Sequence, residues 1–388
     1  MVSFFWVSGI INTMLGTYPK KGEEGKKAVL FNTFLSLFFL SVIAGLMLFG
    51  FAKSLLAFLD KQSGGNMVQL SVVYLLLSNP SFISEYILFL NEKKKAIVVY
   101  GATTGFFSIL AAVLPVALGY PIEYSMYGLI AVAFARLAYA MSLLYQYATF
   151  KFDYRLQTDS LKISAPIIFS LFVSGSAEYI DGIIVKAKFD DMFFAVYRYG
   201  AKELPVLLIV ANTFSTAMIP AIATNLNDGL AELKEKSAKL MHLFFPLTMV
   251  LLIISPVLFK YVFNENFIYS ALIFNIYLLL IIPRVLFPQT VLTGMQKTKF
   301  LLISSILEII INVSLSIYLA GKIKLPGIAV GTFVAYTFDK VFLIGVNWFV
   351  YGVKPSSYIK ALPFWLYTIG TFAAFAVGYR LFQVGFWD

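Results

Sequence analysis

Uninterrupted apolar stretches of about twenty residues recur along the whole of this 388-residue sequence. A helix of about twenty apolar residues is long enough to cross the ~30 Å hydrocarbon layer of a membrane. Hydrophobic residues make up 60% of the chain and charged residues only 13%, which excludes a soluble globular domain. Because the stretches are continuous rather than alternating, they predict helices instead of a membrane β-barrel. The chain is therefore predicted to be an all-α, polytopic membrane protein.

About twelve transmembrane helices are predicted, the first of them short. They cover residues 4–18, 29–51, 67–90, 96–118, 126–150, 163–187, 201–223, 241–263, 268–292, 300–320, 327–350 and 361–383.

Two segments about 200 residues apart share one order of parts. Each has a proline inside an apolar run, Pro80 or Pro283, and each run ends in a short lysine cluster. A second apolar stretch follows, and then a glycine, Gly128 or Gly327, opens a third. Internal repeats of this length are typical of transporters that hold their site between two helix bundles. The sequence thus predicts two pseudo-symmetric lobes.

Aligning the chain on these segments predicts its domains. The expected parts are an N-terminal lobe at 1–150, a cytoplasmic connector at 151–162, a six-helix C-terminal lobe at 163–350 and an additional helix at 351–388. The five spans of the first lobe match the last five of the second. The first helix of the repeat is therefore expected to be missing from the N-terminal lobe.

Charge gives the predicted orientation. The loops after odd-numbered spans hold seventeen Lys and Arg residues and the other loops hold seven, so the first set is expected to be cytoplasmic. The net charge of +10 sits in these short loops, which favours contact with anionic lipid headgroups over nucleic acid. The sequence has no cysteine, one histidine and no phosphate-binding loop motif, so no cofactor is expected beyond a coupling ion, Na⁺ or H⁺.

Several segments together resemble a known family. They are Asp181, the stretch 197–205, Pro220 and the turn at 294–299. In this combination and lobe order the chain resembles the polysaccharide (O-antigen type) flippases, whose superfamily includes the lipid II flippase and the MATE drug exporters. The resemblance covers nearly the whole chain and is strongest from 162 to 354. Since family members have twelve or fourteen helices, it implies that this chain is truncated at both ends.

The resemblance implies a multi-pass protein of the cytoplasmic membrane that is not an enzyme. It would flip a polyprenyl-diphosphate-linked oligosaccharide by alternating access, for surface polysaccharide biosynthesis. A polysaccharide polymerase and glycosyltransferases would be functional partners, and membrane lipids would surround the protein. Two alternatives remain: a cation-coupled MATE-type exporter, against which the arginines within spans count, and a membrane polysaccharide polymerase or ligase, against which the short external loops count.

Cations inside or near the spans are the candidate ligands of the substrate diphosphate and sugars. Arginine suits phosphate because its planar fork donates two parallel hydrogen bonds. The candidates are Arg136, Arg284, Lys340, Arg198 and Lys202. Three of them have a structural alternative: Arg198 and Lys202 lie where long side chains reach the membrane interface, and Lys340 follows Asp339, which predicts an ion pair.

The resemblance to the lipid II flippase also implies a sodium site. Asp181 would give a carboxylate, Asn312 an amide oxygen, Ile328 a backbone carbonyl and Thr332 a hydroxyl, all of them oxygen donors suited to a hard cation. Ser316 stands where the family pattern has a second carboxylate. Three outcomes are open: Ser316 ligates, Glu308 one turn earlier substitutes, or the site is lost. Asn312 would then be an interhelical hydrogen-bonding residue.

Overall fold

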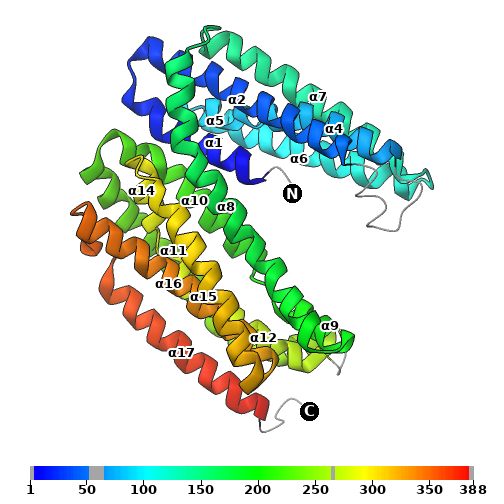
Figure 1. Cartoon of the computed structure of the whole chain (residues 1–388), viewed down its shortest axis with the longest axis vertical. Coiled ribbons are helices and arrows are strands. Elements are labelled where there is room, and N and C mark those ends of the chain that lie inside the picture. The colour runs from blue at the N-terminus through cyan, green and yellow to red at the C-terminus, as the bar shows by residue number, and fades with distance from the viewer. Residues whose placement is uncertain (1–3, 52–64, 264–266, 384–388) are drawn as a thin grey trace. The chain divides into compact units, whose positions relative to one another are not determined.

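The structure is a computed structural model that describes residues 4–51, 65–263 and 267–383. These residues are helical, with no strand among them, which confirms the predicted all-α class (Figure 1). The chain divides into two compact units, Met1–Ile168 (unit 1) and Phe169–Asp388 (unit 2). Each unit is described by itself below.

Unit 1 contains the helices up to α7 and the first part of α8. Their bounds are α1 Phe4–Thr17, α2 Glu23–Gly50, α4 Gly65–Ser81, α5 Ile83–Leu90, α6 Lys94–Ala117 and α7 Ile122–Tyr147, with a 3₁₀ turn at Tyr18–Lys20. In this unit α4 packs against α2 and α7, and α6 packs against α7.

Unit 2 contains the remainder of α8 and the helices that follow it. Their bounds are α8 Tyr154–Lys188, α9 Asp191–Gly200, α10 Pro205–Thr224, α11 Leu226–Val262, α12 Ile268–Leu278, α13 Ile281–Arg284, α14 Pro288–Gly294, α15 Lys299–Ile323, α16 Leu325–Gly345 and α17 Ala361–Gln383. A π-helical turn at Val346–Val350 extends α16. The pairs α15–α16 and α11–α17 are packed along their lengths (Figure 1).

Most of the predicted spans correspond to helices of membrane-spanning length. The described residues contain ten helices that are long and apolar enough to cross a membrane. An eleventh would be the run from Ile268 to Gly294, which is bent by 42° between α13 and α14. The predicted first span is the fourteen-residue α1. The chain is therefore a multi-pass membrane protein.

The stretch 151–162, which is predicted to connect the lobes, is largely helical. Helix α8 begins at Tyr154, because the Asp153 side chain accepts a hydrogen bond from the backbone N–H of Leu156 at 3.1 Å and so caps the helix. The residues before it are tied to α2 by Asn32, which donates to the Lys151 carbonyl at 3.1 Å and accepts from the Asp153 N–H at 3.2 Å. The boundary between the units therefore lies inside a continuous helix.

The two lysine clusters follow turns of identical type. In unit 1 the Lys93 N–H donates to the Leu88 carbonyl at 2.9 Å, and in unit 2 the Lys297 N–H donates to the Leu292 carbonyl at 2.8 Å. The residue before each lysine, Glu92 or Gln296, has a positive φ of 55° or 64°. Both are Schellman helix ends with a non-glycine residue in the left-handed conformation. The sequence repeat thus reappears as a repeat of backbone geometry.

Candidate functional site

Five of the residues that the resemblance assigns to cation coupling come together in unit 2. We call them the Asp181 cluster: Asp181 of α8, Asn312 and Ser316 of α15, and Ile328 and Thr332 of α16. The Thr332 hydroxyl donates to Asp181 Oδ2 at 2.6 Å, and Asn312 Nδ2 donates to Thr332 Oγ1 at 3.1 Å. The Ser316 hydroxyl donates to the Ile328 carbonyl at 3.3 Å. Direct hydrogen bonds therefore join the three helices at this point.

Two tyrosines complete the surroundings of the Asp181 carboxylate. Tyr197 of α9 donates to Asp181 Oδ2 at 3.3 Å, and Tyr277 of α12 donates to the same oxygen at 3.1 Å. The two hydroxyls also lie 3.1 Å apart. With Thr332, three hydroxyls therefore converge on a single oxygen of a carboxylate that is 1% exposed.

Two buried oxygens of the Asp181 cluster accept no hydrogen bond from the described residues. They are Asp181 Oδ1 and Asn312 Oδ1. A buried polar atom left without a partner costs about 1–3 kcal/mol, so such an atom marks a place where a ligand can bind. Carboxylate, amide, carbonyl and hydroxyl oxygens suit a hard cation, and a single carboxylate balances one positive charge. The residues of the cluster therefore fit Na⁺.

A divalent metal fits this cluster less well. No group of three or more His, Cys, Asp or Glu side chains that could hold a metal ion occurs among the described residues. Glu308, the predicted substitute for a second carboxylate, accepts a hydrogen bond from Ser174 of α8 at 3.1 Å. In the described contacts it makes no hydrogen bond to the Asp181 cluster. The cluster thus carries one acidic side chain.

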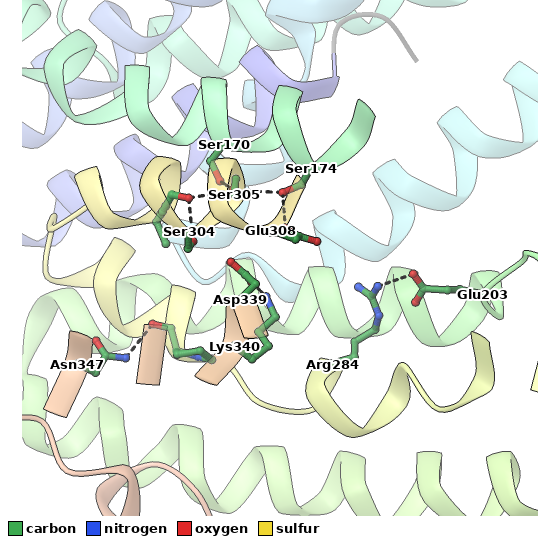
Figure 2. A network of polar contacts seen from close by, with 12 residues as sticks. Ser170, Ser174, Glu203, Arg284, Ser304, Ser305, Glu308, Asp339, Lys340 and Asn347 are labelled. Atoms are coloured by element: carbon green, nitrogen blue, oxygen red, sulfur yellow. Dashed lines mark hydrogen bonds and ion pairs between the residues drawn. The ribbon is translucent and has the colours of Figure 1, made fainter. Parts of the chain in front are cut away.

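A second polar group in unit 2, which we call the cation cluster, consists of Arg284, Lys340 and the Tyr336 ring between them. Arg284 Nη2 lies 2.6 Å from Glu203 Oε1, and Lys340 Nζ lies 2.9 Å from Asp339 Oδ2 (Figure 2). Both cations lie over the Tyr336 ring, 4.8 and 4.7 Å from its centre. The predicted Asp339–Lys340 pair is thus formed, and each cation of the cluster already has a carboxylate partner.

Arg136 of α7 is the predicted substrate cation of unit 1. Its Nε donates to the Tyr100 hydroxyl at 3.3 Å, and its guanidinium lies 4.7 Å from the centre of the Phe82 ring. An acid that is distant in sequence approaches it: Glu85 Oε1 lies 4.0 Å from Arg136 Nη2. The Arg136 side chain is 12% exposed, and that of Glu85 is 39% exposed. Arg136 is therefore a mostly buried cation with a loose acidic partner.

Arg198 and Lys202 are not part of either cluster. They line a half-open groove of about 470 Å³ in unit 2, whose other walls are mostly aromatic side chains of α9, α12 and the end of α11. Both cations are exposed. The structure thus separates the five predicted substrate cations into three places: the cation cluster, the groove and the surroundings of Arg136.

Comparison with protein families places the chain in one of them. Residues 11–272, more than half of the sequence, match the family described as polysaccharide biosynthesis protein. The chain belongs to this polysaccharide biosynthesis protein family. The predicted resemblance to polysaccharide flippases is thereby confirmed at the level of the family. No protein of curated function matches the sequence.

Solved structures share the fold of this polysaccharide biosynthesis protein. A mutant of the Vibrio cholerae MATE transporter VcmN superposes with a TM-score of 0.77 at 12% identity, over 92% of this chain and 87% of that one. An outward-facing multidrug resistance MATE family transporter gives 0.70 at 12% identity, over 90% and 85%. The lipid II flippase MurJ in an inward closed conformation gives 0.55 at 14% identity, over 100% and 92%. At these identities the likeness shows a common fold.

Several contacts at the site of this family member lay beyond the sequence predictions. The Tyr197 hydroxyl donates to Asp181 and Glu203 pairs with Arg284, and neither contact was predicted from the sequence. Arg284 and Glu203 are 81 residues apart, so no local pattern indicates their contact. The available signal was an acid and an arginine in separate predicted spans, since charges inside a membrane are usually paired.

Proposed function

We propose that this protein flips a polyprenyl-diphosphate-linked oligosaccharide across the cytoplasmic membrane by alternating access between its two lobes. The observation that carries the proposal is membership of the polysaccharide biosynthesis protein family in a chain with the fold of membrane transporters. Transport rather than catalysis is proposed, because the solved structures that share this fold are transporters and a flippase. Glycosyltransferases and a polymerase would supply and consume the cargo.

The buried arginines support an anionic cargo. A diphosphate group carries charge that must be matched when it leaves water, and a guanidinium matches it with two parallel hydrogen bonds. Arg136 has a carboxylate only at 4.0 Å, so a phosphate oxygen would improve its coordination. Arg284 and Lys340 are already paired, so an anion would have to displace Glu203 or Asp339 from them. We propose Arg136 as the primary diphosphate ligand and the cation cluster as a secondary one.

The Asp181 cluster supports coupling to a monovalent cation. It offers four kinds of oxygen donor from three helices, and two of its buried oxygens are without donors. Binding of Na⁺ would draw α8, α15 and α16 together, because each helix contributes a ligand. A cation that favours one arrangement of these helices can shift the balance between two conformations of a transporter.

Flipping by the purified protein tests the proposal. Proteoliposomes are loaded with a lipid-linked oligosaccharide, and the fraction accessible to a membrane-impermeant sugar-modifying reagent is followed in time. Wild-type protein should make the oligosaccharide accessible to the reagent faster than it becomes in protein-free vesicles. Arg136→Gln should be slower than wild type, and Arg380→Gln, which removes an exposed arginine from α17, should have the wild-type rate. A rate equal to that of protein-free vesicles would contradict the proposed cargo.

A MATE-type exporter is the second candidate, favoured by the higher TM-score to MATE transporters than to the lipid II flippase. It is separated from the first by efflux of a cationic dye from the same vesicles. Dye efflux without flipping would favour the exporter, and flipping without dye efflux would favour the flippase.

A further inference from the structure

Three serine hydroxyls lead to the buried carboxyl of Glu308 in unit 2 (Figure 2). Ser170 Oγ lies 2.6 Å from Ser305 Oγ, and the Ser174 hydroxyl donates to Ser305 Oγ at 3.2 Å. The Ser305 hydroxyl donates to the Leu301 carbonyl at 2.9 Å. The Ser174 hydroxyl donates to Glu308 Oε2 at 3.1 Å. Ser305 and Glu308 are only 2% and 7% exposed, whereas Ser170 and Ser174 are half-buried. We call the three serines the hydroxyl chain.

The helical register explains why the hydroxyl chain is continuous. Ser170 and Ser174 are four residues apart on α8, and Ser305 and Glu308 are three apart on α15, so each pair lies on one face of its helix. Asn312 of the Asp181 cluster follows Glu308 by four residues on that same face. The hydroxyl chain therefore ends one helical turn from the proposed cation site.

The charges that face Glu308 do not neutralise it. They are Asp339 and Lys340 of α16 and Arg284 of α13, while α8 contributes the Ser174 hydroxyl. Lys340 pairs with Asp339, and Arg284 pairs with Glu203, so these two cations and two carboxylates balance one another. No ion pair of the described residues includes Glu308. As a carboxylate it would therefore be an uncompensated charge inside a membrane helix, where such charges are costly.

We propose that Glu308 is a proton-binding carboxyl and that the hydroxyl chain is its proton path. A proton from water joins the chain at Ser170. For the transfer, the Ser305 hydroxyl turns from the Leu301 carbonyl to Ser174 Oγ, and the Ser174 hydroxyl points to Glu308. Each hydroxyl then passes its own proton to the next oxygen and receives one from behind, and Glu308 Oε2 ends as the O–H of a neutral carboxylic acid. The only bonds made and broken are O–H bonds, and rotation of the hydroxyls resets the chain.

This inference goes beyond the proposed function, because it adds a second coupling ion at a site separate from the Asp181 cluster. Glu308 changes between charges of −1 and 0 close to the cation position. Protonation would weaken the attraction of this region for a cation, and ionisation would strengthen it. The proton and the cation would therefore compete through charge rather than for the same ligands.

Infrared spectroscopy of the purified full chain tests proton binding without any cargo. Across a pH titration, wild-type protein should show the C=O band of a protonated buried carboxyl, and Glu308→Gln should lack it. Ser305→Ala should keep the band but slow its hydrogen–deuterium exchange by at least about tenfold, equivalent to a barrier higher by about 1.4 kcal/mol. Ser305→Thr, which restores a hydroxyl, should exchange at the wild-type rate.

The matched control is Ser304→Ala. Ser304 is the neighbouring residue, is also buried, and, like Ser305, donates to the Leu301 carbonyl at 2.9 Å (Figure 2). Among the described hydrogen bonds, none joins Ser304 to a serine of the hydroxyl chain. Its substitution should leave band and exchange rate unchanged. An unchanged carboxyl band in Glu308→Gln would overturn the proton site. Equal exchange rates in Ser305→Ala and Ser304→Ala would overturn the proton path. Because no cargo is used, neither result depends on the proposed flipping.

Discussion

Buried arginines are neutralised differently in the two units. In unit 2 Arg284 forms a close ion pair, 2.6 Å from Glu203, and Lys340 of the same cation cluster has Asp339 at 2.9 Å. In unit 1 the nearest carboxylate oxygen lies 4.0 Å from Arg136 and belongs to a side chain that is 39% exposed. The two units therefore differ in how their buried arginines are paired, although the sequence repeat relates the units to each other. In the proposed function, the Arg136 cation of unit 1 would be available for an anionic cargo, whereas the charges of the cation cluster in unit 2 already balance one another.

The largest expected difference between the units concerns cation binding. Asp181→Asn removes the single carboxylate of the Asp181 cluster and should weaken Na⁺ binding by at least about 100-fold, or about 2.8 kcal/mol. Equilibrium binding of radioactive sodium to the purified protein measures it. Two control variants should bind Na⁺ as the wild type does: Glu85→Gln, which changes the acid near Arg136 in unit 1, and Asp159→Asn, which changes an exposed acid of α8. If Glu85→Gln weakened Na⁺ binding as much as Asp181→Asn does, the assignment of the ion site to unit 2 would be wrong.

Corresponding glycines should tolerate a methyl group differently. A Cβ on Gly327 would lie 2.4 Å from the Leu319 carbonyl oxygen, a backbone atom that cannot move aside. A Cβ on Gly128 would lie 3.0 Å from the Ala111 side chain. Gly327→Ala should therefore destabilise by about 2–3 kcal/mol and Gly128→Ala by about 1 kcal/mol. Reversible unfolding in mixed detergent measures both, and an equal loss would show that the two helix pairs are packed alike.

Removing the paired arginine should cost more stability than removing the loosely paired one. Arg284→Met leaves Glu203 without its cation and should destabilise by about 2 kcal/mol, below the 3–5 kcal/mol of a fully buried pair because Glu203 is 26% exposed. Arg136→Met should cost less than about 1 kcal/mol. The double variant Arg284→Met/Glu203→Met should recover most of the loss, since it leaves no unpaired charge. No recovery in the same unfolding assay would contradict the assigned ion pair.

The smallest expected effect concerns the turns before the lysine clusters. Glu92 and Gln296 both have positive φ, which costs an L-residue about 1 kcal/mol. Glycine relieves this strain but has more freedom in the unfolded chain, so Glu92→Gly and Gln296→Gly should each stabilise by about 0.5 kcal/mol. Equal shifts in the midpoint of unfolding for the two variants would support the equivalence of the two turns. Destabilisation at only one of them would show that the turns differ.

Much of the fold follows from local sequence, and the site follows in part. Continuous apolar runs predict the spans because burial in lipid acts on each segment separately, and the lysine clusters mark equivalent turns. Composition alone does not show that the connector at 151–162 is helical, because the helix begins at the Asp153 cap within a polar stretch.

The contents of the site depend on contacts between distant helices. The resemblance indicated Asp181, Asn312, Ile328 and Thr332 together, and the structure brings them together. It did not indicate Tyr197 and Tyr277, whose hydroxyls reach Asp181 from two other helices, nor the hydroxyl chain. Serines and tyrosines are common in spans. Which of them form hydrogen bonds depends on how each helix is rotated about its axis, and this rotation cannot be predicted from a single sequence.

Flipping driven by a sodium gradient tests the central claim most directly. Proteoliposomes containing a lipid-linked oligosaccharide are given a Na⁺ gradient, and the translocation rate is compared with that of vesicles without the gradient. The account predicts that the gradient accelerates flipping by the wild-type protein and by Asp159→Asn, and has no effect on Asp181→Asn. Flipping that is equally fast in all three proteins with and without the gradient would contradict cation coupling at the Asp181 cluster, and no flipping by the wild-type protein would contradict the proposed cargo.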